Sequence, residues 1–173
     1  MSLNIYQASV PAFLQTLNAL SGILTKAAAY AEAKKIDPSV LVNARLAPDM
    51  FPLARQIQIA TDHAKGASAR LAGVEVPSYA DTETTFADLQ ARITKTADFI
   101  KSLKPAQFEG ADTREVTLKI AGQEMKFKGA TYLSHFAFPN FYFHATTAYA
   151  ILRHNGVDVG KVDFIGGMTL EDI

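Results

Sequence analysis

Residues 138–156 read FPNFYFHATTAYAILRHNG, and this stretch decides how the fold of the chain is interpreted. Its apolar side chains recur at three- and four-residue spacing, which predicts the buried face of a helix. The helix is expected from about Thr131 to Asn155, with Gly156 closing it. Because the ring of Pro139 clashes with the preceding helical turn, we expect a kink or a split there. The inner side is marked by Leu133, Phe136, Phe141, His144, Ala148, Ile151 and Leu152.

Three earlier segments show the same period and predict three more helices. They lie within about residues 4–34, at about residues 50–72, and from Thr85 onward. Thr85 and Asp88 form the pattern of a capping box, and Asp49 is expected to cap the second helix. The seam of that second helix contains three alanines, which would let a neighbouring helix approach closely or leave space for a ligand.

Between the third and fourth helices the period changes from helical to alternating. Apolar and polar residues alternate from Val116 to Ile120 and again from Met125 to Lys128, with Gly122 between the two runs. This pattern predicts a β-hairpin with one face against apolar side chains. Since an isolated hairpin is marginal in water, we expect it to lie across the bundle and cover one end. The tail after the last helix is expected to pack in part and then fray.

Size and composition indicate one ordinary globular domain, taken as residues 1–173. Hydrophobic residues make up 49% of the chain and charged residues 20%. Seventeen basic residues balance seventeen acidic ones, so nucleic-acid binding is not expected, because it usually needs a basic excess. There is no cysteine, which excludes disulfides, thiolate nucleophiles and cysteine-type zinc sites. No secretory signal and no membrane span are visible, and a cytoplasmic location is expected.

The stretch at residues 138–156 resembles the final helix of DinB/YfiT-like proteins, in which a His-x3-His pair is followed by Leu-Leu-Arg-x-x-Gly. Here His144 stands nine residues before Arg153, and Gly156 completes the matching ending. Asn140 stands where the first histidine of the family would be. The sequence motif PNFYFH…AYAILRHNG, together with DMFPLARQ near residue 50, is similar to an uncharacterised branch of this superfamily. The resemblance implies a mainly all-α fold, a four-helix bundle of DinB/YfiT type with a small hairpin before the last helix.

The resemblance also implies a site for a divalent metal ion such as zinc or nickel, held by three histidines in the superfamily. In this chain the implied ligands are His63, His144 and Asn140. Asn140 and His144 are four residues apart, so they lie one turn apart on one helix face. An asparagine amide is a weaker ligand than an imidazole for such metals, which places the metal in question. Gln56 and Asp62 flank His63 and could orient it.

Three functions follow from these observations, and the sequence leaves them open. The first is a metal-dependent or degenerate enzyme acting on a small molecule, by analogy a thiol-dependent transferase. The second is a non-catalytic helical module that binds a small apolar ligand through the alanine-lined seam and an aromatic cluster. Tyr142 and Tyr149, which add hydroxyls near His144, are the candidate ligand-binding residues. The third is a homodimer formed through an aromatic cluster, since five aromatics within eight residues exceed what one buried stripe can hide. That cluster comprises Phe136, Phe138, Phe141, Tyr142 and Phe143. The alternative for both histidines is a hydrogen-bonded packing role.

Overall fold

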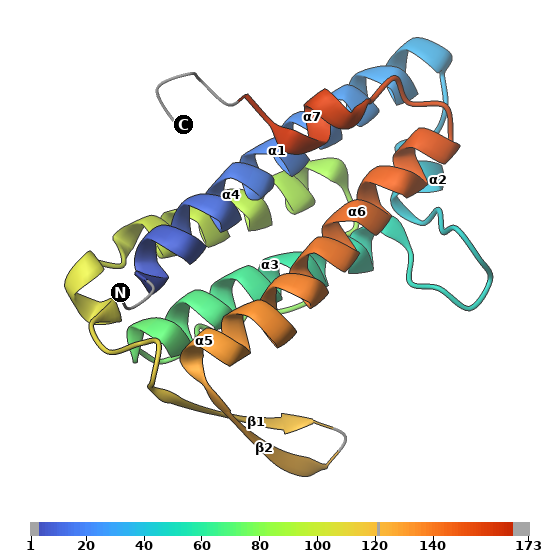
Figure 1. Ribbon diagram of the computed structural model, residues 1–173. Coiled ribbons are helices and arrows are strands. Elements are labelled where there is room, and N and C mark those ends of the chain that lie inside the picture. Colours follow the sequence, from blue (N-terminus) through green and yellow to red (C-terminus); the bar gives the residue numbers. More distant parts are fainter. Residues whose placement is uncertain (1–3, 121, 168–173) are drawn as a thin grey trace.

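The computed structural model describes residues 4–120 and 122–167, and four long helices dominate it (Figure 1). They are α1 (Ile5–Lys34), α3 (Leu53–Ala72), α4 (Phe86–Ser102) and α6 (Phe138–His154). Shorter elements connect them: α2 (Pro38–Val42), the 3-10 turn η1 (Pro105–Phe108), α5 (Gly129–Tyr132), the π-helical segment η2 (Leu133–Ala137) and α7 (Lys161–Ile165). The hairpin strands are β1 (Glu115–Ile120) and β2 (Gln123–Lys128). The mainly helical fold class is therefore confirmed.

The bundle has one long crossover, between α3 and α4. Arg92 of α4 donates to the side chain of Thr61 in α3, while Lys65 of α3 and Lys95 of α4 lie over the same ring of Tyr79. These contacts mean that α3 and α4 run in the same direction, so the connection at residues 74–85 must return along the whole bundle (Figure 1). We call residues 74–85 the strap.

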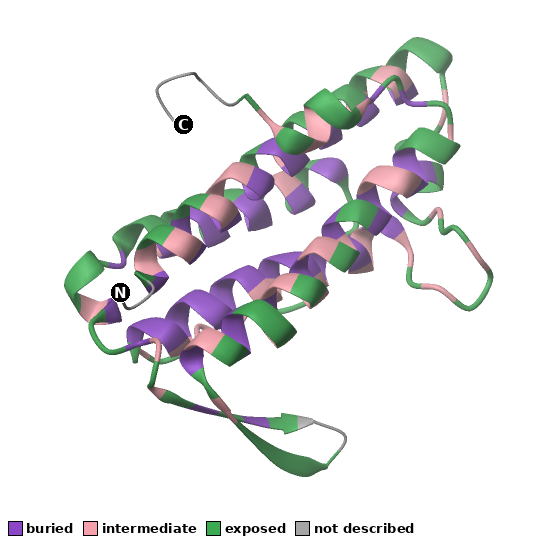
Figure 2. Ribbon diagram, viewed as in Figure 1, coloured by how far each residue is buried: buried purple, intermediate pink, exposed green. Residues whose placement is uncertain are grey.

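The core fills the space between the four long helices. Figure 2 shows buried residues on the facing sides of the helices and exposed residues on their outer sides. The alanines of the α3 seam, Ala60, Ala64 and Ala67, are fully buried, and α3 makes its most extensive contact with α6. These small side chains therefore serve close helix packing, which is the first of the two uses that the sequence suggests.

The ends of the helices follow the capping rules in part. Thr85 and Asp88 form the predicted capping box of α4, with the Asp88 amide donating to Thr85 Oγ1 at 3.1 Å. The prediction that Asp49 caps the second helix is wrong. Pro52 is the N-cap residue and the helix begins at Leu53, whose amide donates to the Ala44 carbonyl at 2.9 Å.

The hairpin is antiparallel, with Val116 opposite Phe127 and Leu118 opposite Met125. Val116 and Leu118 on β1 are buried, whereas Met125 on β2 is 43% exposed. On β2, Phe127 alone packs against the core. Gly129 joins β2 to α5 in a very close approach, because a Cβ atom there would lie 1.8 Å from the Ala111 carbonyl oxygen.

Pro139 is accommodated without a break in the helix. The segment immediately before α6 is π-helical, and the amide of Phe138 donates to the carbonyl of Leu133, five residues back. A π turn is wider than an α turn, so it gives room to the proline ring. It also changes the hydrogen-bond pattern at the point where proline has no backbone N–H to donate. The expected kink or split is therefore realised as a five-residue π segment inside one long helical run.

The tail contains a helix that the sequence did not predict. α7 lies against α1, where Asp163 pairs with Lys26 at 2.7 Å and Gln15 donates to the Ile165 carbonyl at 2.8 Å. The partial packing expected for the tail is present, and the fraying expected beyond it concerns residues 168–173, which lie outside the described ranges.

Candidate functional site

The fold brings His63 and His144 together from two helices that are distant in sequence. Their rings are nearly parallel, with an interplanar angle of 12° and ring centres 5.9 Å apart. His63 comes from the middle of α3 and His144 from the first half of α6. The antiparallel packing of these helices puts the two residues at the same level of the bundle. Both side chains are half-buried, at the edge of the core.

Gln56 orients the second of these rings. Its Oε1 lies 2.7 Å from Nδ1 of His144, and its Nε2 donates to the carbonyl of Phe51 at 3.0 Å. With its amide group anchored in this way, Gln56 presents an acceptor to the ring, so Nδ1 carries the proton and Nε2 keeps a free lone pair. The sequence suggested Gln56 as a partner of His63, but in the structure it contacts His144 instead.

Both imidazoles are held in the neutral form. Burial lowers the pKa of His63 to about 4, assisted by the neighbouring His144 and only partly opposed by the carboxylate of Asp62. Burial, with a contribution from Arg55, also lowers the pKa of His144. A neutral imidazole has a lone pair available to a metal ion or a hydrogen-bond donor at neutral pH.

Asn140 lies one turn before His144 on α6, as predicted. Its Nδ2 donates to the carbonyl of Phe136 at 2.7 Å, in the π-helical segment. Only Oδ1 of this side chain therefore remains available as a ligand atom. Within residues 4–120 and 122–167, no three histidine, aspartate or glutamate side chains converge into a group that could hold a metal ion.

The two tyrosines predicted to contact a ligand lie away from the histidine pair. Tyr142 packs against Phe138 and Phe141, and burial raises the pKa of its hydroxyl. Tyr149 packs on Phe164 of α7, with ring centres 5.8 Å apart. Neither tyrosine lines the pocket that opens beside His63.

That pocket has a volume of about 240 Å³, and the first strand of the hairpin forms one of its walls. Leu118 and Lys119 come from β1, Asp62 and Arg70 from α3, and Tyr132 and Phe136 from the helix that follows the hairpin. Phe136 also makes an edge contact with His63, at 5.9 Å between ring centres. The sequence does not identify Arg70 and Tyr132 as site residues, because they come from helices on either side of the hairpin. Only the folded position of the hairpin shows that they line one pocket.

A buried arginine lies behind this site. Arg92 in α4 binds Asp62, Asp81 and Glu83, each at 2.9–3.0 Å, although its own side chain is only 1% exposed. It thereby ties the strap to α3, next to His63. Glu83 stands two residues before Thr85, the N-cap residue of α4, and its side chain forms this ion pair. This ion pair could have been predicted from the sequence, because Arg92 stands beside Ile93 on the apolar stripe of the helix. A buried arginine there needs an acidic partner.

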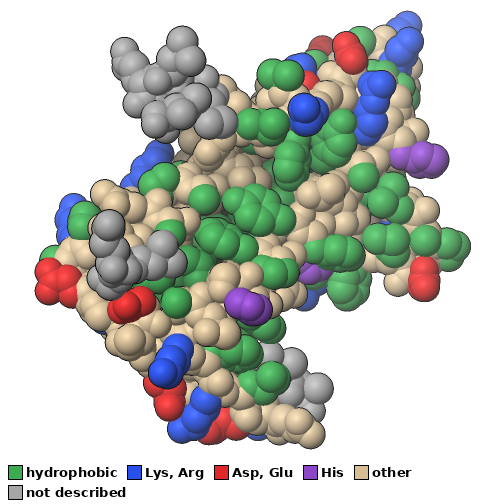
Figure 3. Space-filling view, in the orientation of Figure 1, with side chains coloured by type: hydrophobic (Ala, Val, Ile, Leu, Met, Phe, Trp, Pro, Cys, Tyr) green, Lys and Arg blue, Asp and Glu red, His purple; other side chains and the backbone are tan. Residues whose placement is uncertain are grey.

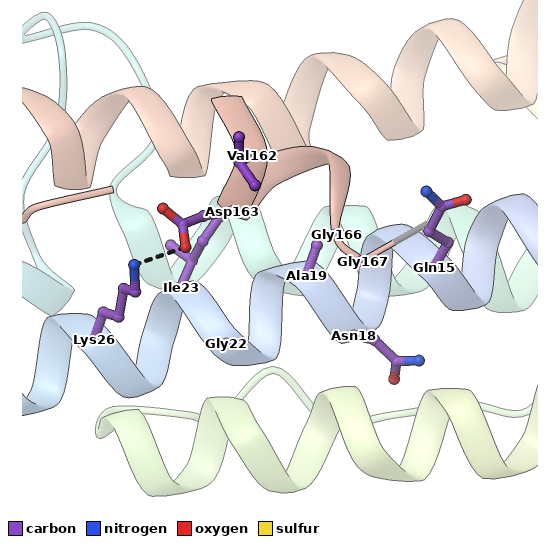
Figure 4. A pocket seen from close by; sticks show the side chains of 10 residues that line it. All are labelled: Gln15, Asn18, Ala19, Gly22, Ile23, Lys26, Val162, Asp163, Gly166 and Gly167. Carbon is purple, nitrogen blue, oxygen red and sulfur yellow. Dashed lines mark ion pairs between the residues drawn. The ribbon is translucent and has the colours of Figure 1, made fainter. Parts of the chain in front are cut away.

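Other surface features lie apart from the histidines. A groove of about 430 Å³ runs between α1 and α7, and its two charged side chains, Lys26 and Asp163, pair with each other (Figure 4). On another side, hydrophobic side chains gather where the connection between α2 and α3 meets α6 (Figure 3). Leu46, Met50, Tyr142 and Phe143 line this second hollow, which we call the apolar surface.

Of the five residues in the predicted aromatic cluster, Phe141 is fully buried and Phe136, Phe138 and Tyr142 pack against the core. Only Phe143, at 57% exposure, remains largely open. Among the described helices, none combines the length and hydropathy that a membrane span requires.

Comparison with known proteins supports the resemblance seen in the sequence. Residues 5–165 match the family described as Domain of unknown function (DUF1993). The crystal structure of a DinB family member protein from Shewanella denitrificans is 44% identical in sequence, covers 95% of this chain and 93% of that chain, and superposes with a TM-score of 0.89. No curated protein matches the chain. Both the predicted resemblance and the predicted fold type are thus confirmed, and the chain belongs to the DUF1993 family of DinB-like proteins.

Proposed function

We propose that this protein binds one divalent metal ion between His63 and His144 and acts with it on a small molecule. The observation that carries the proposal is the pairing of two neutral imidazoles, one of which is oriented by Gln56. Two imidazole nitrogens that share a zinc ion each lie about 2.0–2.1 Å from it, so the ring centres are roughly 5–6 Å apart. The ring centres of this pair are 5.9 Å apart, and because the rings are nearly parallel, a shared ion would require one ring to turn until both lone pairs point at it.

The donor set favours borderline metals such as zinc or nickel, for which imidazole is a good ligand. Nε2 of His144 and a ring nitrogen of His63 would be the protein ligands, and Oδ1 of Asn140, one turn before His144 on α6, would be the third. A metal ion bound there would act as a Lewis acid with open positions for water or a thiolate, as in thiol-dependent transferases. The residues around it would orient the substrate and, through the hairpin, limit access of water.

The second candidate is a metal-free site that binds a small ligand through hydrogen bonds to the same histidines. This candidate is favoured by the small number of metal ligands, because among the described residues no third imidazole or carboxylate joins the two histidines. In this case Nε2 of His144 would accept a hydrogen bond from the ligand, while Gln56 fixes the tautomer. The two candidates differ in one measurable property, the metal content of the protein.

The test is the metal content of untagged protein purified without chelator and then incubated with zinc, nickel or manganese. We expect close to one ion per chain, lost in both His63→Ala and His144→Ala. The chain offers matched controls, since His135 and His154 are exposed residues away from the pair, and their alanine variants should keep the ion. Absence of metal in the parent protein would exclude the first candidate and leave the second.

A further inference from the structure

Arg70 faces the pocket beside His63 without an acidic partner. It lies seven residues after His63 on α3, which puts both side chains on the same face of the helix. Among the described residues, no carboxylate forms an ion pair with Arg70, and its hydrogen bond is a long one of 3.4 Å to the hydroxyl of Tyr132. A half-buried guanidinium usually binds a carboxylate or phosphate, because its planar donors match two oxygens of such a group.

The one acidic side chain in the pocket does not compensate this charge. Asp62 binds Lys65 at 2.8 Å and Arg92 at 2.9 Å, and both of those cations are nearly fully buried. Its negative charge is therefore already paired with these two cations. Lys119 on β1 adds a further positive charge to the wall of the pocket.

The helix makes room for the guanidinium with a glycine. Gly66 is buried in the middle of α3, where glycine lowers helix stability by roughly 0.5–1 kcal/mol relative to alanine. A Cβ atom at this position would lie 2.5 Å from Nη1 of Arg70. The side chain of Arg70 thus folds back over Gly66, toward the level of His63, and occupies space that any other residue would take.

The remaining walls are apolar. Leu118 of β1 and Phe136 of the π segment face the pocket together with the ring of Tyr132. Burial raises the pKa of Tyr132, so its hydroxyl stays protonated and can donate to an anion while it accepts from Arg70. With a volume of about 240 Å³, the pocket is smaller than the roughly 300–1,000 Å³ of sites for drug-sized ligands.

We propose that this pocket binds a small organic anion, with its carboxylate or phosphate on Arg70 and an apolar body of about one ring between Leu118 and Phe136. The inference deepens the proposed function, because it names the substrate class of the same site. The charged group would lie toward Arg70 and the body toward the histidine pair.

The experiment is a calorimetric titration of metal-free protein with four probes: benzoate, phenyl phosphate, inorganic phosphate and benzyl alcohol. We expect saturable binding of benzoate or phenyl phosphate, at least tenfold weaker binding of benzyl alcohol, and a loss of about tenfold or more in Arg70→Gln. Comparison of the first two probes distinguishes a carboxylate from a phosphate ligand, and inorganic phosphate should bind more weakly than the aromatic anion. Arg153→Gln, on the exposed side of α6, is the control and should bind as the parent does.

Gly66→Ala provides a second test that retains every charge. The added methyl group should displace the guanidinium and weaken anion binding severalfold, while the melting temperature stays equal or rises. Gly22→Ala is its matched control, because Gly22 is also helical and a Cβ atom there meets nothing within 4 Å. Binding that is unchanged in both Arg70→Gln and Gly66→Ala, or benzyl alcohol that binds as tightly as benzoate, would overturn the proposal.

The outcome is separable from that of the metal measurement. Anion binding is measured without metal, so a protein that takes up no ion can still bind benzoate. Conversely, Arg70→Gln keeps both histidines and should retain the metal content of the parent protein.

Discussion

His63 links the chemistry of the site to the stability of the fold. Its pKa is about 4 in the folded protein, against 6.5 for an unperturbed imidazole, so between these values the unfolded chain binds more protons than the folded one. The free energy of unfolding must therefore fall as the pH is lowered from 6.5 to 4. The loss attributable to His63 is on the order of 2–3 kcal/mol in metal-free protein, since one unit of pKa shift corresponds to about 1.4 kcal/mol.

Urea unfolding at a series of pH values between 7 and 4 measures this effect. In His63→Gln the slope of stability against pH should be reduced by more than half, with the remainder coming from His144 and the carboxylates. His135→Gln is the control, because that residue is exposed and should leave the slope as it is. An unchanged slope in His63→Gln would show that the ring is already protonated or well solvated in the folded protein.

Arg92 makes the most buried contacts to the strap, alongside Arg55, which pairs with Asp81, and Gln58, which donates to Glu83. Arg92 neutralises Asp62, Asp81 and Glu83 from a position with 1% exposure, and it also donates to the carbonyl of Ala80. Removing one partner of a buried ion pair typically costs about 3–5 kcal/mol, and the partial exposure of Asp62 and Asp81 puts this case at the lower end of that range. We expect Arg92→Ala to destabilise the protein by about that amount and to release the strap before the helices unfold.

Hydrogen exchange of the backbone amides in residues 74–85 measures that release. Exchange there should accelerate in Arg92→Ala, whereas α1 and α6 should change only in proportion to global stability. Lys101→Ala, an exposed substitution near the end of the same helix, is the control and should alter neither quantity. Uniform acceleration across the whole chain would mean that Arg92 stabilises the bundle without a special role in the strap.

The elements were predictable to different degrees, for physical reasons. α1, α4, α6 and β1 follow from side-chain periodicity, because each buries one continuous apolar face. β2 follows from its alternating pattern, although most of its side chains are exposed. α7 escaped this approach since it is five residues long and none of its residues is buried. The π segment could be located through Pro139, but its geometry depends on hydrogen bonds that the ring of the proline displaces.

The candidate site was predictable only where a family pattern supplied the residues. His63 and His144 follow from that pattern, and the fold brings them together. Arg70 and Tyr132 could not be found, since they meet only after the hairpin has folded back over α3. Such contacts depend on long-range topology, which local periodicity does not encode.

Assembly of the whole chain into a homodimer remains a prediction, and the structure changes where its interface is expected. Most of the aromatic cluster is turned inward, while Phe143 stays 57% exposed beside Leu46, which is 40% exposed. We therefore expect contact through the apolar surface. Phe143→Asp should lower the average mass in sedimentation velocity from dimer toward monomer, because burying an unpaired carboxylate opposes association.

Val162→Asp is the matched control for this measurement. Val162 is 80% exposed on α7, away from the apolar surface, so an aspartate there adds the same charge without touching the interface. A parent protein that sediments as a monomer across all concentrations would contradict the prediction. A dimer that persists in Phe143→Asp would place the interface elsewhere.

The π segment Leu133–Ala137 has a consequence for how proteins of this architecture can diverge. A π turn holds one residue more than the α turn it replaces. Loss of a single codon in this region would rotate the hairpin just before it by about 100° around the helix axis relative to α6. The hairpin with Leu118 would then swing away from the pocket, while His144 kept its place. One insertion or deletion can thus change which hairpin residues line the pocket, while both histidines are retained in the sequence.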